Sequence, residues 1–328
     1  MAADTLAPLA RFPGGWPAWP DYALVDDLLP TLERWSAEGR RIALATLVEV
    51  VGSSPRPVGS EMAIADDGEC AGYVSGGCVE AAVANEALAV LAEGRPRLLD
   101  YGAGSPVLDV QLSCGGRIRI LVRELVDAQD HVRRLRLART ERRTLTVLTQ
   151  LDSGSMRYAD GAITAPDERT HARLQAPPLR LIVVGGDPIV IALLRLAPMF
   201  GIEVLLLRPN GPEQFAPGEP QPVAYERRGL TTALPAIALD GRCAVYTLSH
   251  DADTDHAILA WALRSPAFCI GALGSRSKAR TRLERLRGDG FDEAALARLF
   301  SPAGLDIGAR TPQEIALSIL CQVIAERR

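Results

Sequence analysis

Two cysteines in this chain of 328 residues stand beside glycine pairs. One turn reads Gly76-Gly77-Cys78 and opens an alanine-rich segment, and the other reads Cys114-Gly115-Gly116. A glycine pair permits positive φ and lets a ligand approach the backbone closely. A thiol at a helix N-terminus is stabilised as the thiolate by the positive end of the helix dipole. The two turns together predict a site built from glycine backbone and sulfur.

Other chemistry for these cysteines finds less support in the sequence. A structural zinc site needs four clustered ligands, and no Cys-x-x-Cys pair or nearby histidine supplies them. Nucleophilic catalysis needs a placed base, and no recognisable motif contains any of the histidines, His131, His171, His250 and His256. Two interpretations stay open. Either the thiols handle sulfur or orient a ligand, or both cysteines only pack at tight turns.

The composition narrows the class of protein. The chain has 36 Lys and Arg against 40 Asp and Glu, and its pI of about 5.7 argues against a general nucleic-acid binder. Its six widely spaced cysteines form no disulfide pattern and fit a reducing compartment. The first 30 residues lack the apolar core of a signal peptide, and the most apolar stretch, 189–207, contains Arg195 and Glu203. We therefore expect a soluble, cytoplasmic protein with no nucleic-acid or membrane partner.

The first half of the chain predicts an α+β domain over residues 22–126, preceded by an irregular Trp- and Pro-rich arm over 1–21. Two prolines fix the path of the loop 52–60, in which Ser54 and Arg56 are candidate ligand contacts. A basic helix and one strand are expected in a connecting region over 127–178. The expected elements of the domain are helices at 26–38 and 79–91 and strands at 41–51, 62–64, 69–75, 97–101, 107–112 and 117–124.

From residue 179 onward, strands and helices alternate with short connections. This alternation is typical of a doubly wound parallel sheet. The fold class is therefore α/β, with an N-terminal α+β domain followed by a Rossmann-like parallel-sheet domain over 179–328. The expected strands are 181–184, 201–207, 243–248 and 268–273, and the expected helices are 188–200, 254–263, 278–287 and 312–326.

The first turn of this second domain departs from the dinucleotide-binding fingerprint. A Gly-x-Gly-x-x-Gly turn receives a pyrophosphate at a helix N-terminus. Here Gly185 keeps the first glycine position, and Asp187 brings a negative charge to the second. Arg208 replaces the acidic residue expected after the second strand. Ordinary NAD binding is therefore disfavoured, whereas Arg208 beside Gly185 and Gly186 suits a phosphate, as in NADP or a pterin dinucleotide.

Two further polar loops follow expected strands. Gly274, Ser275 and Arg276 offer backbone donors, a hydroxyl and a cation at a helix start, which suits either a phosphate or a helix cap. The run 249–256 lacks the glycine and the distant glutamate of a calcium loop, so its aspartates are expected to cap a helix. The arginines of the last basic helix are expected to face solvent, at positions 280, 282, 285 and 287.

Several multi-residue segments match one known family in order along the chain. In the first half they are 52–59, 75–80 and 114–116, and in the second half they are 248–251, 270–276, 301–309 and 311–319. With them the chain resembles the XdhC/CoxI family, accessory proteins of molybdenum hydroxylases such as xanthine dehydrogenase. The resemblance excludes the arm and the region 127–178. It departs from the family at Asp187, where glycine is usual.

The resemblance implies a cytoplasmic, non-catalytic chaperone that binds molybdenum cofactor, as molybdopterin or its dinucleotide. Such a chaperone supports sulfuration of the cofactor and inserts it into an apo molybdenum hydroxylase, with a cysteine desulfurase as second partner. The Trp- and Pro-rich arm favours a homodimer. The alternatives are an NADP-dependent oxidoreductase that uses the second domain, and a docking scaffold that holds no cofactor.

The candidate cofactor contacts come from both halves of the chain. Cys78 or Cys114 is the candidate neighbour of molybdenum. The full set is Ser54, Arg56, Gly76, Gly77, Cys78, Glu80, Cys114, Gly115, Gly116, Gly185, Gly186, Arg208, Gly274, Ser275 and Arg276.

Overall fold

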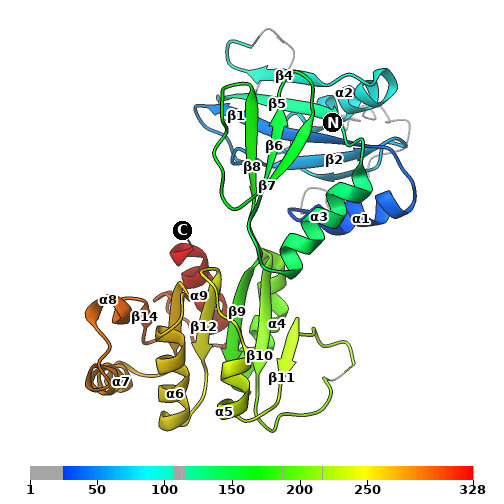
Figure 1. The fold of residues 1–328 in the computed structure, drawn as a ribbon. Coiled ribbons are helices and arrows are strands. Elements are labelled where there is room, and N and C mark those ends of the chain that lie inside the picture. Colours follow the sequence, from blue (N-terminus) through cyan, green and yellow to red (C-terminus); the bar gives the residue numbers. More distant parts are fainter. Residues whose placement is uncertain (1–24, 106–111, 113–114, 187, 216, 328) are drawn as a thin grey trace, which may run out of the picture. The chain divides into compact units, whose positions relative to one another are not determined.

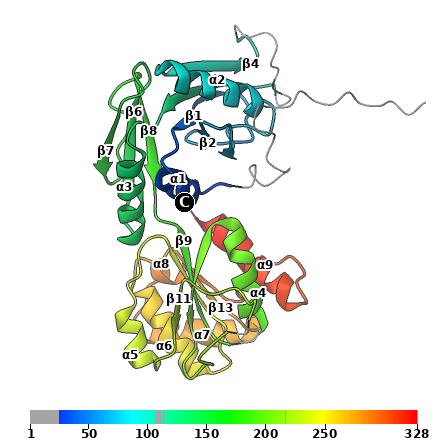
Figure 2. The ribbon, with the colours of Figure 1, turned by 90° about the vertical axis from the view of Figure 1, so that its right-hand side faces the viewer.

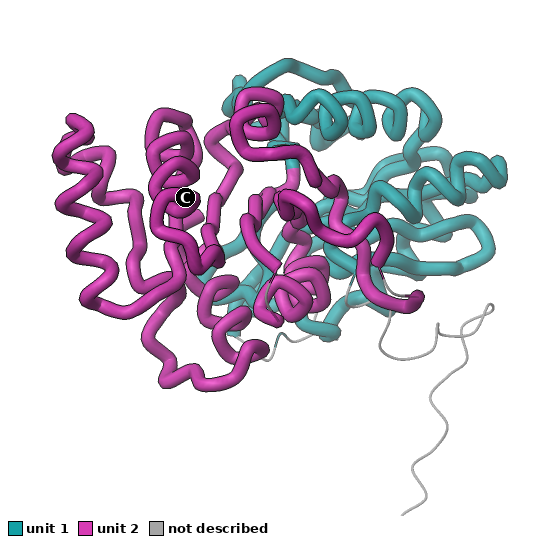
Figure 3. Tube along the Cα trace, turned by 90° about the horizontal axis from the view of Figure 1, so that it is seen from below, with its two compact units in different colours: residues 1–177 teal, residues 178–328 magenta. Residues whose placement is uncertain are grey.

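A computed structural model describes residues 25–105, 112, 115–186, 188–215 and 217–327. The chain splits into two compact units, residues 1–177 and 178–328 (Figure 3). The expected arm over 1–21, most of the expected strand 107–112, and Cys114 and Asp187 lie outside the described residues. None of the helices in the described ranges combines the length and the apolar character that crossing a bilayer requires.

The first unit is organised by an antiparallel sheet whose described strands run in the order β3-β2-β1-β5-β4 (Figure 1). The central strand β1 is rich in β-branched and aliphatic residues and pairs with β2 and β5, so that Leu44 stands opposite both Ala63 and Arg123. The strands are β1 (Ile42–Val51), β2 (Glu61–Ala65), β3 (Cys70–Gly72), β4 (Arg97–Gly102) and β5 (Arg117–Glu124).

Helix α2 (Glu80–Glu93) covers one face of this sheet and ends at Gly94, whose φ of 70° closes the last turn. Its apolar face packs on the inward residues of β1 and β5 in a mainly aliphatic cluster that includes Val83, Val90 and Ile120. Helix α1 (Leu29–Ala37) packs on the opposite face of the sheet with its buried Trp35.

Residues 128–175 form a helix and a second antiparallel sheet, in the order β7-β6-β8 among the described strands. The sequence predicts the helix and β6 but misses β7 and β8, because Met-Arg-Tyr-Ala-Asp and Thr-His-Ala-Arg-Leu-Gln carry polar side chains on both faces. Helix α3 packs on α1 through Leu135 and Ala138. The elements are α3 (Ala128–Thr140), β6 (Leu145–Gln150), β7 (Met156–Asp160) and β8 (Thr170–Gln175).

The second unit confirms the expected doubly wound fold: its described strands are parallel, in the order β11-β10-β9-β12-β13-β14. Alternate residues of β9 face opposite layers, so that Leu181 packs against α4 and α9, and Ile182 packs against α5 and α6 (Figure 2). The strands are β9 (Leu179–Val184), β10 (Ile202–Leu207), β11 (Ala224–Glu226), β12 (Cys243–Thr247), β13 (Cys269–Ala272) and β14 (Leu299–Phe300). The helices are α4 (Pro188–Leu196), α5 (Leu230–Ala233), α6 (Ala252–Leu263), α7 (Arg276–Gly288), α8 (Glu293–Leu296) and α9 (Pro312–Glu326).

One expectation for α7 is wrong. Arg282 does not face solvent: its side chain is 12% exposed and forms an ion pair with Asp255, whose side chain is 3% exposed. Asp255 also accepts a hydrogen bond from the Thr247 hydroxyl at 2.5 Å, and Arg282 donates to Ser301 at 3.3 Å. The buried carboxylate on α6 therefore turns this arginine inward and links α6 to the end of β12 and to α7.

A polar cluster is buried between the two sheets of the first unit, around the carboxylate of Glu61. His131 is 2% exposed, and its Nδ1 lies 2.8 Å from the Tyr158 hydroxyl. The pKa of His131 is lowered to about 4, chiefly by burial; the charge of Glu61 raises it, and the charges of Arg123 and Arg173 lower it. His131 is therefore neutral in the folded unit at neutral pH.

This burial predicts a loss of stability at acidic pH. Below about pH 6.5 the unfolded chain binds a proton on His131, whereas the folded unit does not bind one until about pH 4. We expect the free energy of unfolding of the first unit to fall by about 2 to 3 kcal/mol between pH 7 and 4.5 from this residue. Urea unfolding at both pH values should show a smaller fall in His131→Gln and an unchanged fall in a control, His250→Gln, on the exposed surface of the second unit. Equal falls in wild type and His131→Gln would contradict the assignment.

Candidate functional site

The loop between β3 and α2 is built around the carboxylate of Glu80, which is 1% exposed. Its Oε1 accepts hydrogen bonds from the amides of Ser75 at 2.7 Å and Val74 at 3.2 Å, and its Oε2 accepts from the Ser75 hydroxyl at 2.7 Å and the Val79 amide at 3.2 Å. These donors satisfy both oxygens of the buried carboxyl group. Glu80, a predicted ligand contact, therefore lies beneath the loop and shapes it.

The loop presents Cys78 at the start of α2. The thiol-bearing residue is exposed, and its amide donates to the Ser75 hydroxyl at 3.1 Å. Gly77 has a φ of 99°, which favours glycine. The amides of Gly76 and Gly77 donate no hydrogen bond to any part of the chain that the structure describes. They precede Val79, the N-cap of α2, by three and two residues.

A pocket of about 410 Å³ opens beside this loop. Its walls come from the loop after β1, the loop before α2 and the start of β5. The lining residues are Ser53, Ser54, Pro55, Ser75, Gly76, Cys78, Leu112 and Ile118. The structure thus brings together Ser54, Gly76 and Cys78 of the predicted site, from segments more than 20 residues apart.

Gly116 sets the distance between two of these segments. A Cβ at Gly116 would overlap the carbonyl oxygen of Ser53, and a Cβ at Gly102 would overlap the carbonyl oxygen of Gly116. Glycine is therefore required here for backbone packing alone. Gly115, with a φ of 71°, is exposed, and Cys114 is outside the described residues.

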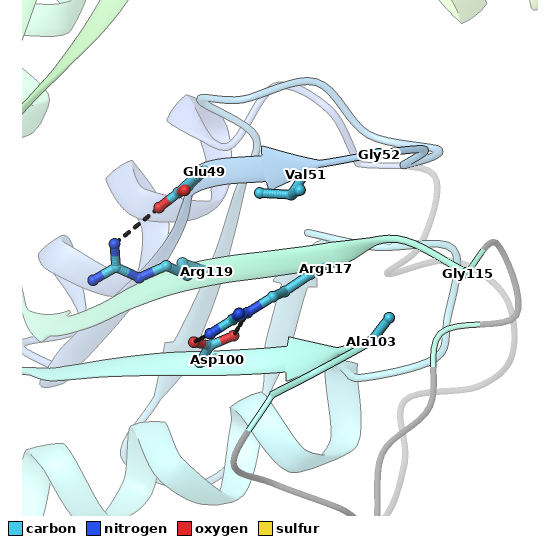
Figure 4. A pocket seen from close by; sticks show the side chains of 8 residues that line it. All are labelled: Glu49, Val51, Gly52, Asp100, Ala103, Gly115, Arg117 and Arg119. Atoms are coloured by element: carbon cyan, nitrogen blue, oxygen red, sulfur yellow. Dashed lines mark hydrogen bonds and ion pairs between the residues drawn. The ribbon is translucent and has the colours of Figure 1, made fainter.

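A second pocket, of about 600 Å³, lies on the sheet face opposite α2; the predicted contact Gly115 lines it, and its other lining residues were not predicted. Figure 4 shows Arg117 directed at Asp100 and Arg119 directed at Glu49 across neighbouring strands. Hydrogen bonds from Arg117, at 2.8 and 2.5 Å, hold the pKa of Asp100 below its usual value. Arginines on alternate residues of the expected strand 117–124 were the signal for this charged face.

Arg56 does not line either pocket. Its guanidinium lies over the Tyr73 ring at 4.0 Å and donates to the Tyr73 hydroxyl at 3.0 Å and to Asp26 at 2.7 Å. Its amide donates to the Ser54 hydroxyl at 3.2 Å. In this arrangement Arg56 fixes the path of the loop after β1.

In the second unit, Gly185, Gly186 and Arg208 meet in a pocket of about 720 Å³ at the carboxyl ends of β9, β10 and β12. The Arg208 guanidinium lies against Gly186, so that a Cβ there would require this side chain to move. The sequence did not predict that four further polar residues line this pocket, because they lie in or next to α5 and α6, far along the chain from Gly185. They are Thr231, Ser249, His250 and Thr254.

The third predicted group lies elsewhere in the second unit. Ser275 caps α7, with its hydroxyl accepting from the Lys278 amide at 3.4 Å. The Arg276 side chain is 91% exposed and lies 3.9 Å from Asp306. Gly274 has a φ of 146° and lies beside Arg282. The expected capping role of the run 249–256 is confirmed, since Asp251 accepts from the Thr254 amide at 2.7 Å.

Comparison with known proteins gives consistent matches. Residues 181–323 match the model of the XdhC Rossmann domain, and residues 35–102 match that of the XdhC and CoxI family. The molybdenum cofactor insertion chaperone PaoD of Escherichia coli is 30% identical over 94% of this chain and 92% of its own length. A protein of Bacillus subtilis, described as a probable subunit of xanthine dehydrogenase, is 24% identical over 87% of this chain and 93% of its own.

A solved structure shares the fold. A crystal structure of a xanthine dehydrogenase from Bacillus halodurans superposes with a TM-score of 0.76, covering 92% of this chain and 96% of that one, at 24% identity.

The buried carboxylate predicts a strong effect of one substitution. Glu80→Ala leaves the surrounding amides without an acceptor, so we expect the first unit to lose about 3 kcal/mol of stability. Glu80→Gln keeps one acceptor oxygen and should lose less. Chemical denaturation measures both. Glu86→Ala on the same helix removes an exposed ion pair with Arg97 and should cost at most about 1 kcal/mol. If Glu80→Ala were no worse than this control, the loop would not depend on Glu80.

Proposed function

Because this chain belongs to the XdhC and CoxI family, we propose that it is an accessory chaperone that binds molybdenum cofactor and inserts it into an apo molybdenum hydroxylase of the xanthine dehydrogenase type. The observation that carries this proposal is the similarity over nearly the whole length to PaoD, a molybdenum cofactor insertion chaperone. The pocket beside Cys78 gives the cargo a place in the first unit.

The pocket suits the chemistry of this cargo. Molybdenum cofactor is an anionic pterin with a phosphate. The amides of Gly76 and Gly77, which donate no hydrogen bond to the described chain, are available to an anion, and Ser53 and Ser54 add polar residues to the lining. A volume of about 410 Å³ falls in the range of small-molecule sites.

Cys78 supports a role in sulfuration. Cys78 is exposed, lines the pocket and lies two residues before the start of α2. In this proposal Cys78 or Cys114 contacts the molybdenum centre or carries a sulfur atom that a cysteine desulfurase has delivered. Transfer from the persulfide of the desulfurase to the thiolate exchanges one persulfide for another, so this step needs no separate oxidant.

Cysteine variants test this site. The full chain is purified from a molybdenum-replete host, and bound molybdenum and pterin are quantified. We expect Cys78→Ser and Cys114→Ser to lower the bound cofactor by about tenfold, which corresponds to about 1.4 kcal/mol of binding free energy. Cys321→Ser, a half-buried cysteine on α9, is the control. Unchanged loading in both Cys78→Ser and Cys114→Ser would contradict the proposal that these cysteines contact the cofactor.

One observation favours a second candidate, an NADP-dependent oxidoreductase. Arg208 lines the pocket at the end of β10, a position that suits pairing with a 2′-phosphate. Fluorescence titration with NADPH should show micromolar binding that Arg208→Ala weakens about tenfold or more, if this candidate holds. Absence of binding together with copurified pterin supports the chaperone. A chain that carries neither ligand but captures an apo-hydroxylase is a docking scaffold.

A further inference from the structure

The loop 52–60 forms one wall of the pocket beside Cys78, and its end is held by hydrogen bonds from two directions. The Gly59 amide donates to the carbonyl of Leu47 on β1 at 2.8 Å, and the Leu47 amide donates back to Ser60 at 2.9 Å. These bonds join the loop to the strand from which it departs. Gly59 has a φ of 91°, so the chain reverses sharply at this point.

Arg173 reaches this reversal from β8, in the other sheet of the first unit. Its Nε donates to the Gly59 carbonyl at 2.8 Å, and its guanidinium lies 3.1 Å from the carboxylate of Glu61, the first residue of β2. Its Cγ lies 3.8 Å from the position that a Cβ of Gly59 would occupy. One side chain thus holds both the end of the loop and the start of the next strand.

Glu61 makes this contact specific. Its side chain is 8% exposed, against 20% for Arg173, and its Oε1 accepts from the Thr46 hydroxyl at 3.1 Å. The negative charge of Glu61 also raises the pKa of the Arg123 guanidinium, against the lowering that burial causes; Arg123 is 3% exposed. Removing one partner from a mostly buried ion pair leaves the other charge uncompensated. The contact therefore resists rearrangement far more than an exposed ion pair would.

We infer that Arg173, acting with Glu61, is a positioning residue that fixes the loop 52–60 and thereby the Ser53–Pro55 wall of the cofactor pocket. This inference rests on the proposed function for its consequence, the retention of cofactor. It gives residues 128–175 a role, although they lie outside both family-model matches, 35–102 and 181–323. The last strand of this region, β8, carries the guanidinium that reaches the loop.

Hydrogen exchange of the full chain tests the positioning role without any cofactor. In Arg173→Ala we expect the hydrogen-bonded loop amides of Arg56, Gly59 and Ser60 to exchange about 10-fold to 100-fold faster, since a hydrogen bond from a charged donor to this loop is lost. Arg173→Lys keeps one donor and should restore part of the protection. Arg157→Ala, an exposed arginine on β7, is the matched control. Unchanged exchange in α3 shows that the region remains folded in each variant.

Release of bound pterin after dilution tests the consequence. We expect faster release from Arg173→Ala, intermediate release from Arg173→Lys and wild-type release from Arg157→Ala. Unchanged loop exchange in Arg173→Ala, or faster exchange with unchanged release, overturns the inference. A wild-type chain without pterin would instead contradict the proposed function, and loop exchange alone then decides whether Arg173 fixes the loop.

Discussion

The site in the first unit depends on one buried carboxylate. A buried carboxyl group is costly unless hydrogen-bond donors surround its oxygens. Glu80 obtains these donors from the tight loop that the preceding residues form, from Val74 to Val79. The two glycines in this loop and Cys78 are exposed. Their exposure follows from the hydrogen bonds that the flanking residues make to Glu80.

Other kinds of contact hold the remaining loops around the pocket in place. Gly116 packs backbone against backbone at Ser53, which leaves no room for any side chain. Arg56 stacks on Tyr73, and Arg173 holds the far end of the loop 52–60 through its hydrogen bond to Gly59. The pocket walls are therefore rigid because each is fixed by a contact with a different element. Rigid walls reduce the entropy lost when a ligand binds.

Much of the fold could be predicted from the sequence, because continuous apolar runs such as 42–47 and 181–184 report burial directly. The strands β7 and β8 could not, since their side chains are mainly polar and one of them, Arg173, points into a buried ionic cluster. In the site, three of the predicted residues, Ser54, Gly76 and Cys78, line the pocket of about 410 Å³. The internal roles of Glu80 and Arg56 were not foreseeable, because they depend on which partners the fold brings near: Ser75 and Val79 for one, Tyr73 for the other.

The long separation between Gly59 and Arg173 has a consequence for the order of biosynthesis. These residues are 114 positions apart, yet one hydrogen bond joins them. At ribosomal rates of about 5 to 20 residues per second, Arg173 follows Gly59 out of the ribosome after roughly 6 to 20 s. During that interval the strands β1 and β2 can pair, but the loop between them lacks its outer support. Maturation of the pocket is therefore a late event in the synthesis of the first unit.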